Sequence, residues 1–118
     1  MASVPAPAGL DKTTAKLWRD TQRALRDQAT WQDTDAPLLE AYVSSVATAR
    51  RCRRDAEAEP YVTGSKGQMV PHPGVRMAAE AERDAAKLAE ALLLTPQARR
   101  RHDIRPARTG DGPLLEAI

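Results

Sequence analysis

The chain has 118 residues, a formal net charge of +2 and a hydrophobic share of 42%, with two Trp, two Tyr and no Phe. One small domain with so few large side chains buries little core alone, which favours oligomerisation as a source of buried area. Its single cysteine excludes an internal disulfide, and it has neither a signal-peptide pattern nor the roughly 18 consecutive apolar residues of a membrane span. We therefore expect a soluble, intracellular protein without a membrane partner.

Residues 1–10 contain Pro5, Pro7 and Gly9, a composition that predicts a flexible N-terminal arm. A helix is expected over residues 11–27, with Asp11 as its N-cap. At about 100° per residue, four of its side chains fall on one side, which we predict to be the core face. These four are Leu17, Trp18, Thr21 and Leu25.

A second helix is expected from residue 34 or 35, because Pro37 is tolerated in a first helical turn. Its apolar stripe comprises Leu38, Leu39, Tyr42, Val43, Val46 and Ala49. The same stripe continues into Arg50 and Arg53 of the run RRCRR at residues 50–54, so we expect the last turns to leave the core. Pro60 ends this helix, since the residue before a proline avoids the helical region.

Two short strands, residues 61–63 and 68–70, are predicted around the turn GSKG, which gives a two-stranded β-hairpin. A third helix, residues 73–93, has a broad Ala-rich face that includes Glu82, which suggests packing both within the subunit and against a neighbour. Thr95 and Pro96 predict the start of a short fourth helix. The predicted fold is thus mainly α, with about four helices and a hairpin between the second and third, in one domain over residues 11–103 with the hairpin at 61–70.

The sequence after residue 103 is rich in turn residues, and we expect residues 104–118 to form a flexible C-terminal tail. The basic excess of the chain lies in this region, because residues 95–118 carry five basic and three acidic residues. The tail ends with an apolar pattern typical of a docking peptide, formed by Leu114, Leu115 and Ile118.

Basic residues gather in three clusters. On the first expected helix they are spaced 4, 3, 4 and 3 apart and so lie within an arc of about 80°, facing away from Trp18: Lys12, Lys16, Arg19, Arg23 and Arg26. The second cluster is Arg50, Arg51, Arg53 and Arg54, and the third is Arg99, Arg100 and Arg101. Each pattern fits phosphate contacts, and each also fits a solvated face paired with nearby carboxylates such as Asp20 and Asp27.

The signs of catalysis are weak. The GSKG turn lacks the spacing of a nucleotide-binding loop and no helix follows it directly. His72 and His102 have no partners at metal-ligand spacing, and Cys52 lacks the His and Asn of a thiol nucleophile. We expect a protein without enzymatic activity, cofactor or metal, in which His72 serves the entry into the third helix.

The ordered set of motifs resembles the small terminase subunit of tailed bacteriophages over roughly residues 10–102. The motifs are LW at 17–18, PLLEAYV at 37–43, a G..G hairpin followed by HP at 64–73, and LLLTPQARRR at 92–101. Two positions depart from the usual pattern. Leu93 replaces a Gly, which removes a natural C-cap and favours a longer third helix, and Gly74-Val75 replaces a bulkier pair.

The resemblance implies a homo-oligomeric ring in the host cytoplasm. It would bind double-stranded viral DNA at the packaging site, recruit the large terminase subunit with its ATPase and nuclease, and regulate those activities. The three basic clusters would be the DNA contacts, because a ring multiplies weak Arg–phosphate contacts by its copy number. Leu114, Leu115 and Ile118 would dock on the large subunit, and the subunit interface would comprise Tyr61, Val62, Met69, Val70, Val75, Ala78, Glu82, Ala85 and Ala89.

Two other functions stay open on the sequence alone. The first is a dimeric helix-turn-helix transcriptional regulator. The apolar start of the second helix argues against it, because a recognition helix needs polar, base-reading residues at that position. The second is a structural phage adaptor that does not bind DNA and whose arginines pair with neighbouring acids.

Overall fold

The computed structural model describes residues 3–104, which contain four helices and a two-stranded sheet. The helices are α1, Lys12–Asp27; α2, Ala36–Ala58; α3, Gly74–Ala91; and α4, Pro96–Arg101; a 3-10 turn, Asp33–Asp35, precedes α2. The first three are long, with 16, 23 and 18 residues, whereas α4 has only six. The mainly helical prediction is confirmed, with the fourth predicted helix present only as this short segment.

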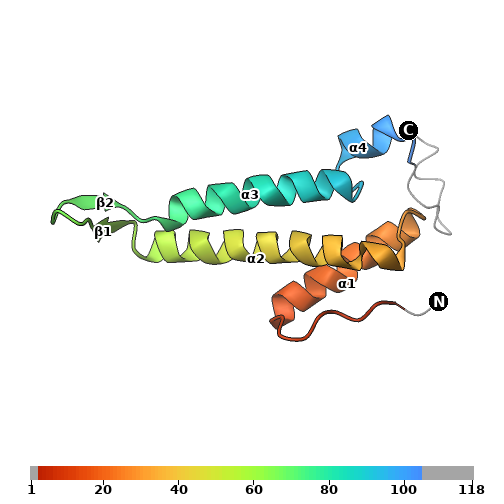
Figure 1. Ribbon diagram of the computed structural model, residues 1–118, viewed down its shortest axis with the longest axis horizontal. Coiled ribbons are helices and arrows are strands. Elements are labelled where there is room, and N and C mark those ends of the chain that lie inside the picture. The colour runs from red at the N-terminus through yellow and green to blue at the C-terminus, as the bar shows by residue number, and fades with distance from the viewer. Residues whose placement is uncertain (1–2, 105–118) are drawn as a thin grey trace, which may run out of the picture.

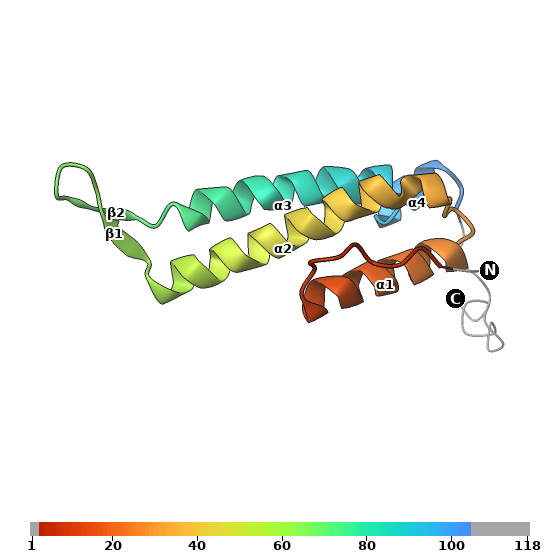
Figure 2. The same cartoon turned by 60° about the horizontal axis from the view of Figure 1, so that its bottom comes forward.

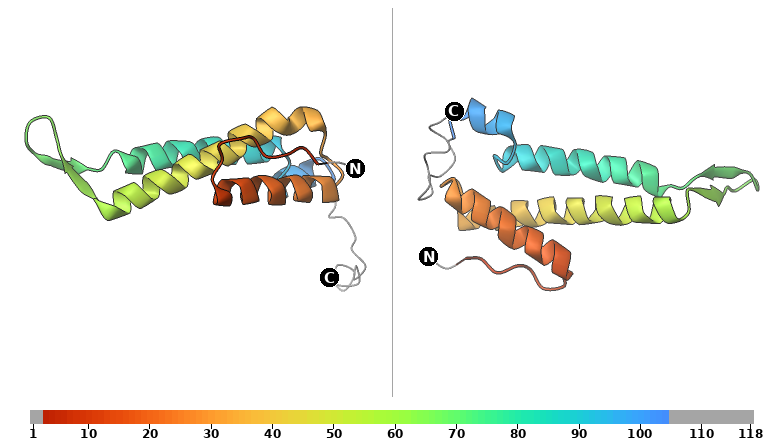
Figure 3. Two further views of the ribbon diagram at one scale, coloured as in Figure 1. Left: turned by 90° about the horizontal axis from the view of Figure 1, so that it is seen from below. Right: turned by 180° about the vertical axis from the view of Figure 1, so that it is seen from behind.

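The antiparallel pair of α2 and α3 gives the molecule its length, and the whole measures 61 × 35 × 23 Å (Figure 1). α1 crosses α2 at one end of this pair, and α4 follows the end of α3 on the same side of the molecule (Figure 2). The β-hairpin projects from the opposite end in every view (Figure 3). The crossing of α1 and the hairpin are therefore separated by most of the length of α2.

The apolar core lies where α1 crosses the first turns of α2 and meets the end of α3. Its buried members are Trp18 and Leu25 from α1, Leu39 and Val43 from α2, and Leu92. Partly buried side chains complete it, namely Val4, Ala6, Leu10, Leu17, Trp31, Ala36, Leu38, Tyr42 and Leu94. Trp18 and Leu25 confirm the predicted core face of the first helix, to which the structure adds the buried polar residues Thr14 and Gln22.

Away from this core, small side chains hold α2 against α3, including Ala49, Cys52 and Ala78. Gly74, in the first turn of α3, lies so close to α2 that a Cβ atom would be 2.7 Å from the carbonyl oxygen of Cys52. Only glycine permits this approach of two backbones. His72 Nδ1 accepts a hydrogen bond from the Gly74 N–H at 2.8 Å, which confirms His72 as the residue that opens the helix.

Residues 3–11 pack on the molecule, which differs from the predicted flexible arm. The indole Nε1 of Trp18 donates a hydrogen bond to the carbonyl oxygen of Val4 at 3.1 Å. Val4, Ala6 and Leu10 lie against the core. A buried indole N–H needs an acceptor, and this segment supplies it.

Three helices end in the same way, with a residue in the left-handed region that is not glycine. Ala29 after α1, Leu93 after α3 and Asp103 after α4 have φ angles of 62°, 64° and 55°. The backbone bonds of a Schellman motif accompany each turn, for example Leu94 N–H to Ala89 O at 2.9 Å. The expectation that Leu93 lengthens the third helix is therefore wrong, because α3 ends at Ala91 and Leu93 adopts the glycine conformation itself.

The hairpin pairs β1, Tyr61–Thr63, with β2, Met69–Pro71, in the register Val62 opposite Val70. The second strand begins one residue later than predicted, because Gln68 belongs to the turn. Its carbonyl oxygen accepts from the Gly64 N–H at 2.6 Å, and its side-chain oxygen accepts from the Lys66 N–H at 3.0 Å. Among the described residues, no helix has both the length and the hydropathy needed to cross a bilayer.

Candidate nucleic-acid interface

The predicted basic stripe lies on the solvent side of α1, with Lys12, Lys16, Arg19 and Arg23 exposed and Arg26 half-buried. Lys16 Nζ pairs with Asp20 Oδ2 at 2.6 Å. This hydrogen bond lowers the pKa of Asp20, and the charges of Arg23 and Arg19 lower it further. Lys12, Arg19 and Arg23 form no ion pair with the described part of the chain. These three cations are therefore available to an anionic partner.

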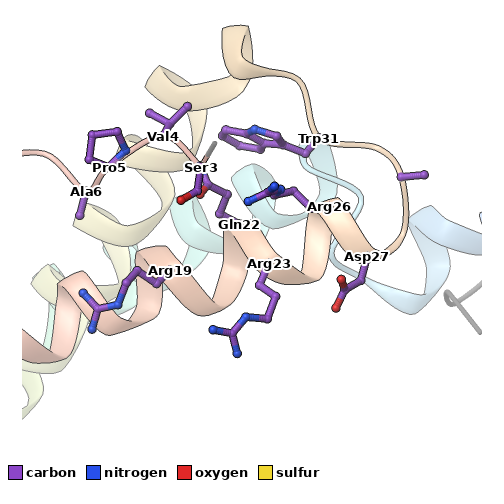
Figure 4. A pocket seen from close by; sticks show the side chains of 11 residues that line it. Ser3, Val4, Pro5, Ala6, Arg19, Gln22, Arg23, Arg26, Asp27 and Trp31 are labelled. Atoms are coloured by element: carbon purple, nitrogen blue, oxygen red, sulfur yellow. The ribbon is translucent and has the colours of Figure 1, made fainter. Parts of the chain in front are cut away.

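A groove of about 850 Å³ runs between α1 and residues 3–6 (Figure 4). Gln22 lies at its inner side and is only 3% exposed. Its amide nitrogen Nε2 is buried and has no hydrogen-bond partner among the described residues. The remaining lining residues are Ser3, Val4, Pro5, Ala6, Arg19, Arg23, Arg26, Asp27, Ala29 and Trp31.

The four arginines of the second cluster are exposed on α2, whereas Cys52, which lies between them in the sequence, is buried. Arg53 turns toward α3 and makes a two-point ion pair with Glu82, with Nη2 to Oε1 at 2.7 Å and Nε to Oε2 at 3.2 Å. The hydrogen bond from Arg53 lowers the pKa of Glu82, and the bond to Glu82 raises the pKa of Arg53. Arg53 was predicted to contact DNA, yet its guanidinium already has an anionic partner in the chain.

Arg50 and Arg54 flank a second, smaller groove of about 410 Å³ between α2 and α3. Val46, Ala49 and Ala85 supply its apolar lining. Arg54 is also close to the start of α1, where Asp11 caps the helix by accepting from the Thr14 N–H at 2.7 Å. The pKa of Asp11 is lowered chiefly by its hydrogen bonds with Thr14, and the charge of Arg54 adds to this effect. A charge of the second basic cluster therefore acts on the N-cap of the helix that carries the first.

Two arginines of the third cluster contact residues at the end of α3 and in the turn that follows it. Arg99 Nη1 donates to the carbonyl oxygen of Leu94 at 2.6 Å, and Arg101 Nη1 pairs with Glu90 Oε1 at 3.1 Å. Only Arg100 is exposed without an ion pair to the described residues. The structure thus gives two of these three arginines a structural partner.

The residues predicted for a subunit interface fall into three groups. Tyr61 and Met69 on the hairpin are 60% and 65% exposed, and Val75 is also exposed. Ala78 is fully buried within the chain, and Glu82 is the partner of Arg53. The half-buried members are Val62, Val70, Ala85 and Ala89. Leu114, Leu115 and Ile118 lie outside the described residues.

Sequence reasoning missed Gln22, Trp31 and residues 3–6 as parts of one groove. The signal at Gln22 was available, because an amide four residues after Trp18 and three before Leu25 lies on the core face. Sequence reasoning also missed Met77, which is exposed near the start of α3. Within residues 3–104, no group of three or more His, Cys, Asp or Glu side chains is placed to hold a metal ion.

A family model described as "Phage terminase, small subunit" matches residues 14–108, more than half of the chain. No curated protein and no solved structure matches the sequence. The match covers all four helices and the hairpin, and it begins within the first turn of α1.

Proposed function

The chain belongs to the phage terminase small-subunit family, which gives it a part in phage DNA packaging, and from this premise we propose that it recognises the viral DNA. In this proposal it binds double-stranded DNA at the packaging site and recruits and regulates the large terminase subunit. One observation carries the DNA contact. Lys12, Arg19 and Arg23 lie exposed on one side of α1, without an ion pair in the described chain. Such cations bind phosphates without regard to sequence.

The contribution of the second and third basic clusters to DNA binding depends on which of their arginines already have a partner within the chain. Arg50, Arg51 and Arg54 are exposed and would add to the phosphate contacts of the α1 stripe. Arg53, Arg99 and Arg101 are engaged within the chain. We therefore place the DNA contact mainly on α1 and on the arginines of α2 that have no ion pair within residues 3–104, with Arg100 as an outer contact.

We further propose that several copies assemble into a ring through the hairpin and the nearby part of α3. An isolated two-stranded hairpin is marginal in water, and this one exposes Tyr61 and Met69 far from the core. Val75 and Met77 add exposed apolar side chains near the start of α3, about 200° apart around the helix. A ring joins two different surfaces of each copy, and it multiplies each phosphate contact by the number of copies.

The role proposed for the chain is recognition without catalysis or a cofactor, in the cytoplasm of the phage host. The large subunit would supply the ATPase and the nuclease. The apolar pattern of Leu114, Leu115 and Ile118 is the proposed contact with that subunit, on the ground of sequence alone.

Two measurements on the full chain test this function. Native mass spectrometry with and without duplex DNA gives the copy number, for which we expect a ring of more than two subunits. Fluorescence anisotropy with duplex DNA at several salt concentrations should show affinity falling steeply as salt rises. A dimer would favour a transcriptional regulator, and an assembly without affinity for DNA would favour a structural adaptor.

A further inference from the structure

We propose that the groove between α1 and residues 3–6 receives a phosphate group and that the side-chain amide of Gln22 donates a hydrogen bond to it. The inference rests on the proposed function in one respect, because the phosphate is taken to be that of duplex DNA. It assigns a binding role to a residue that is neither charged nor exposed.

The first argument is the unpartnered amide. Gln22 is only 3% exposed, yet its amide nitrogen Nε2 has no hydrogen-bond acceptor among the described residues. An unsatisfied buried donor destabilises the folded state, whereas an apolar side chain of similar size would fit a core-facing position without this cost. Packing alone therefore does not explain an amide between Trp18 and Leu25. A ligand that brings a hydrogen-bond acceptor to this position would explain it.

The second argument is the charge around the groove. Arg19 and Arg23 line it, are exposed and make no ion pair with the described residues, although their side chains, like that of Asp27, extend away from Gln22 in Figure 4. Arg26 lines the groove between Gln22 and Trp31. Asp27 is the one carboxylate in the lining, and its side chain points away from Gln22 in this view. Several cations beside a neutral amide donor suit a phosphate, whose oxygens accept several hydrogen bonds at once.

The third argument concerns the wall formed by residues 3–6. Nε2 is shielded from solvent, and Gln22 points toward Ser3 and Val4 in Figure 4. The hydrogen bond from Trp18 to the Val4 carbonyl holds this segment in place. A phosphate oxygen therefore reaches Nε2 when residues 3–6 move outward. This movement gives Nε2 a partner but breaks the hydrogen bond from Trp18 to the Val4 carbonyl oxygen, so the contacts of the incoming phosphate have to offset that loss.

The first test compares Gln22→Leu with Gln97→Leu, a matched control on the exposed surface of α4. We expect Gln22→Leu to weaken duplex DNA binding by about tenfold, the factor for a charge-assisted hydrogen bond of ordinary strength. Its melting temperature should equal or exceed that of the wild type, since no buried amide is left unsatisfied. Wild-type affinity for DNA in a folded Gln22→Leu protein would overturn the proposal.

A second test separates this inference from the proposed function. The side-chain amide signal of Gln22 in a ¹⁵N spectrum is identified as the one missing in Gln22→Leu, and inorganic phosphate is then added, with chloride as the control. A shift with phosphate alone supports the groove as a phosphate site even if duplex DNA fails to bind, in which case only the packaging function fails. No shift with either phosphate or duplex DNA overturns the inference.

Discussion

Arg53 and Glu82 lock α2 to α3 through a two-point ion pair, with nitrogen–oxygen distances of 2.7 and 3.2 Å. Sequence patterns assign the first residue to DNA and the second to a neighbouring subunit, whereas the structure makes them each other's partner. Both side chains are about half exposed, so solvent and salt weaken their attraction. The pair nevertheless joins the last third of α2 to the middle of α3.

A double-mutant cycle measures this pair. Arg53→Ala and Glu82→Ala should each lower the midpoint of urea unfolding, and the double variant should lose less than the sum of the two. Arg51→Ala, at an exposed arginine on the same helix with no ion pair to the described residues, controls for the effect of alanine on helix stability. Strictly additive effects would show that the pair does not contribute to stability in solution.

The same pair predicts a dependence on pH. The pKa of Glu82 lies below its ordinary value of 4.5 because Arg53 donates to the carboxylate. A carboxyl group whose pKa is lowered in the folded state stabilises the fold at any pH above its ordinary pKa. This stabilisation is lost as the pH falls through the lowered pKa of the folded state. The difference in unfolding midpoint between wild type and Glu82→Gln should therefore be present at neutral pH and vanish in acid. A difference that persists unchanged in acid would contradict this account.

The left-handed residue after α1 offers a simple gain in stability. Ala29 is exposed and has φ 62°, a conformation that costs a residue with a Cβ about 1 kcal/mol relative to glycine. Ala29→Gly should therefore raise the free energy of unfolding by about that amount. Ala24→Gly, in the interior of the same helix, should lower it by about 0.5–1 kcal/mol. Equal effects of the two substitutions would contradict the observed cap.

The helix caps also show how far local sequence determines this fold. Asp11 and Thr95 were predicted as N-caps and accept from the Thr14 and Ala98 N–H groups, because a cap depends on residues within one turn. The C-caps were not predictable in this way. Leu93 carries no glycine signal, and its left-handed turn is supported from elsewhere, since Gln28 Nε2 donates to its carbonyl oxygen across 65 positions of sequence.

In the candidate site, too, features that depend on one helix were predictable, and features that depend on distant segments were not. The basic stripe follows from helical spacing and was predicted from the sequence. The groove beside it was not, because it depends on residues 3–6 returning to accept a hydrogen bond from Trp18. The pairing of Arg53 with Glu82 likewise joins residues 29 positions apart, and charge patterns within one helix do not reveal such a partner.

The contact between Gly74 and α2 predicts a loss of stability from a small change. In most helices Gly→Ala stabilises, by up to about 1 kcal/mol. At Gly74 the new methyl group would lie 2.7 Å from the Cys52 carbonyl oxygen and 2.8 Å from His72 Nδ1. Gly74→Ala should therefore destabilise the fold by about 1–3 kcal/mol, as overpacking does. Urea unfolding measures whether the substitution lowers or raises the free energy of unfolding. An increase would show that α3 can move away from α2.

The α1 stripe can be tested for phosphate contact one residue at a time. Arg19→Ala and Arg23→Ala should each weaken binding to any duplex and reduce the slope of log affinity against log salt by about 1. Arg76→Ala, an exposed arginine on α3 outside the three clusters, should leave the slope unchanged. The same slope in all three variants would reduce the stripe to a solvated helix face.

In the proposed ring, other copies cover Tyr61 and Met69 at the end remote from the core, so the stability of the chain should depend on its concentration. Side chains that only other copies can cover contribute nothing to a lone chain, so their share of the free energy of unfolding grows with protein concentration. Melting temperatures measured at low and high concentration should then differ, and substitutions in the hairpin should remove the difference. Within an infected cell, the accumulation of the chain would itself stabilise the end that a single copy leaves bare.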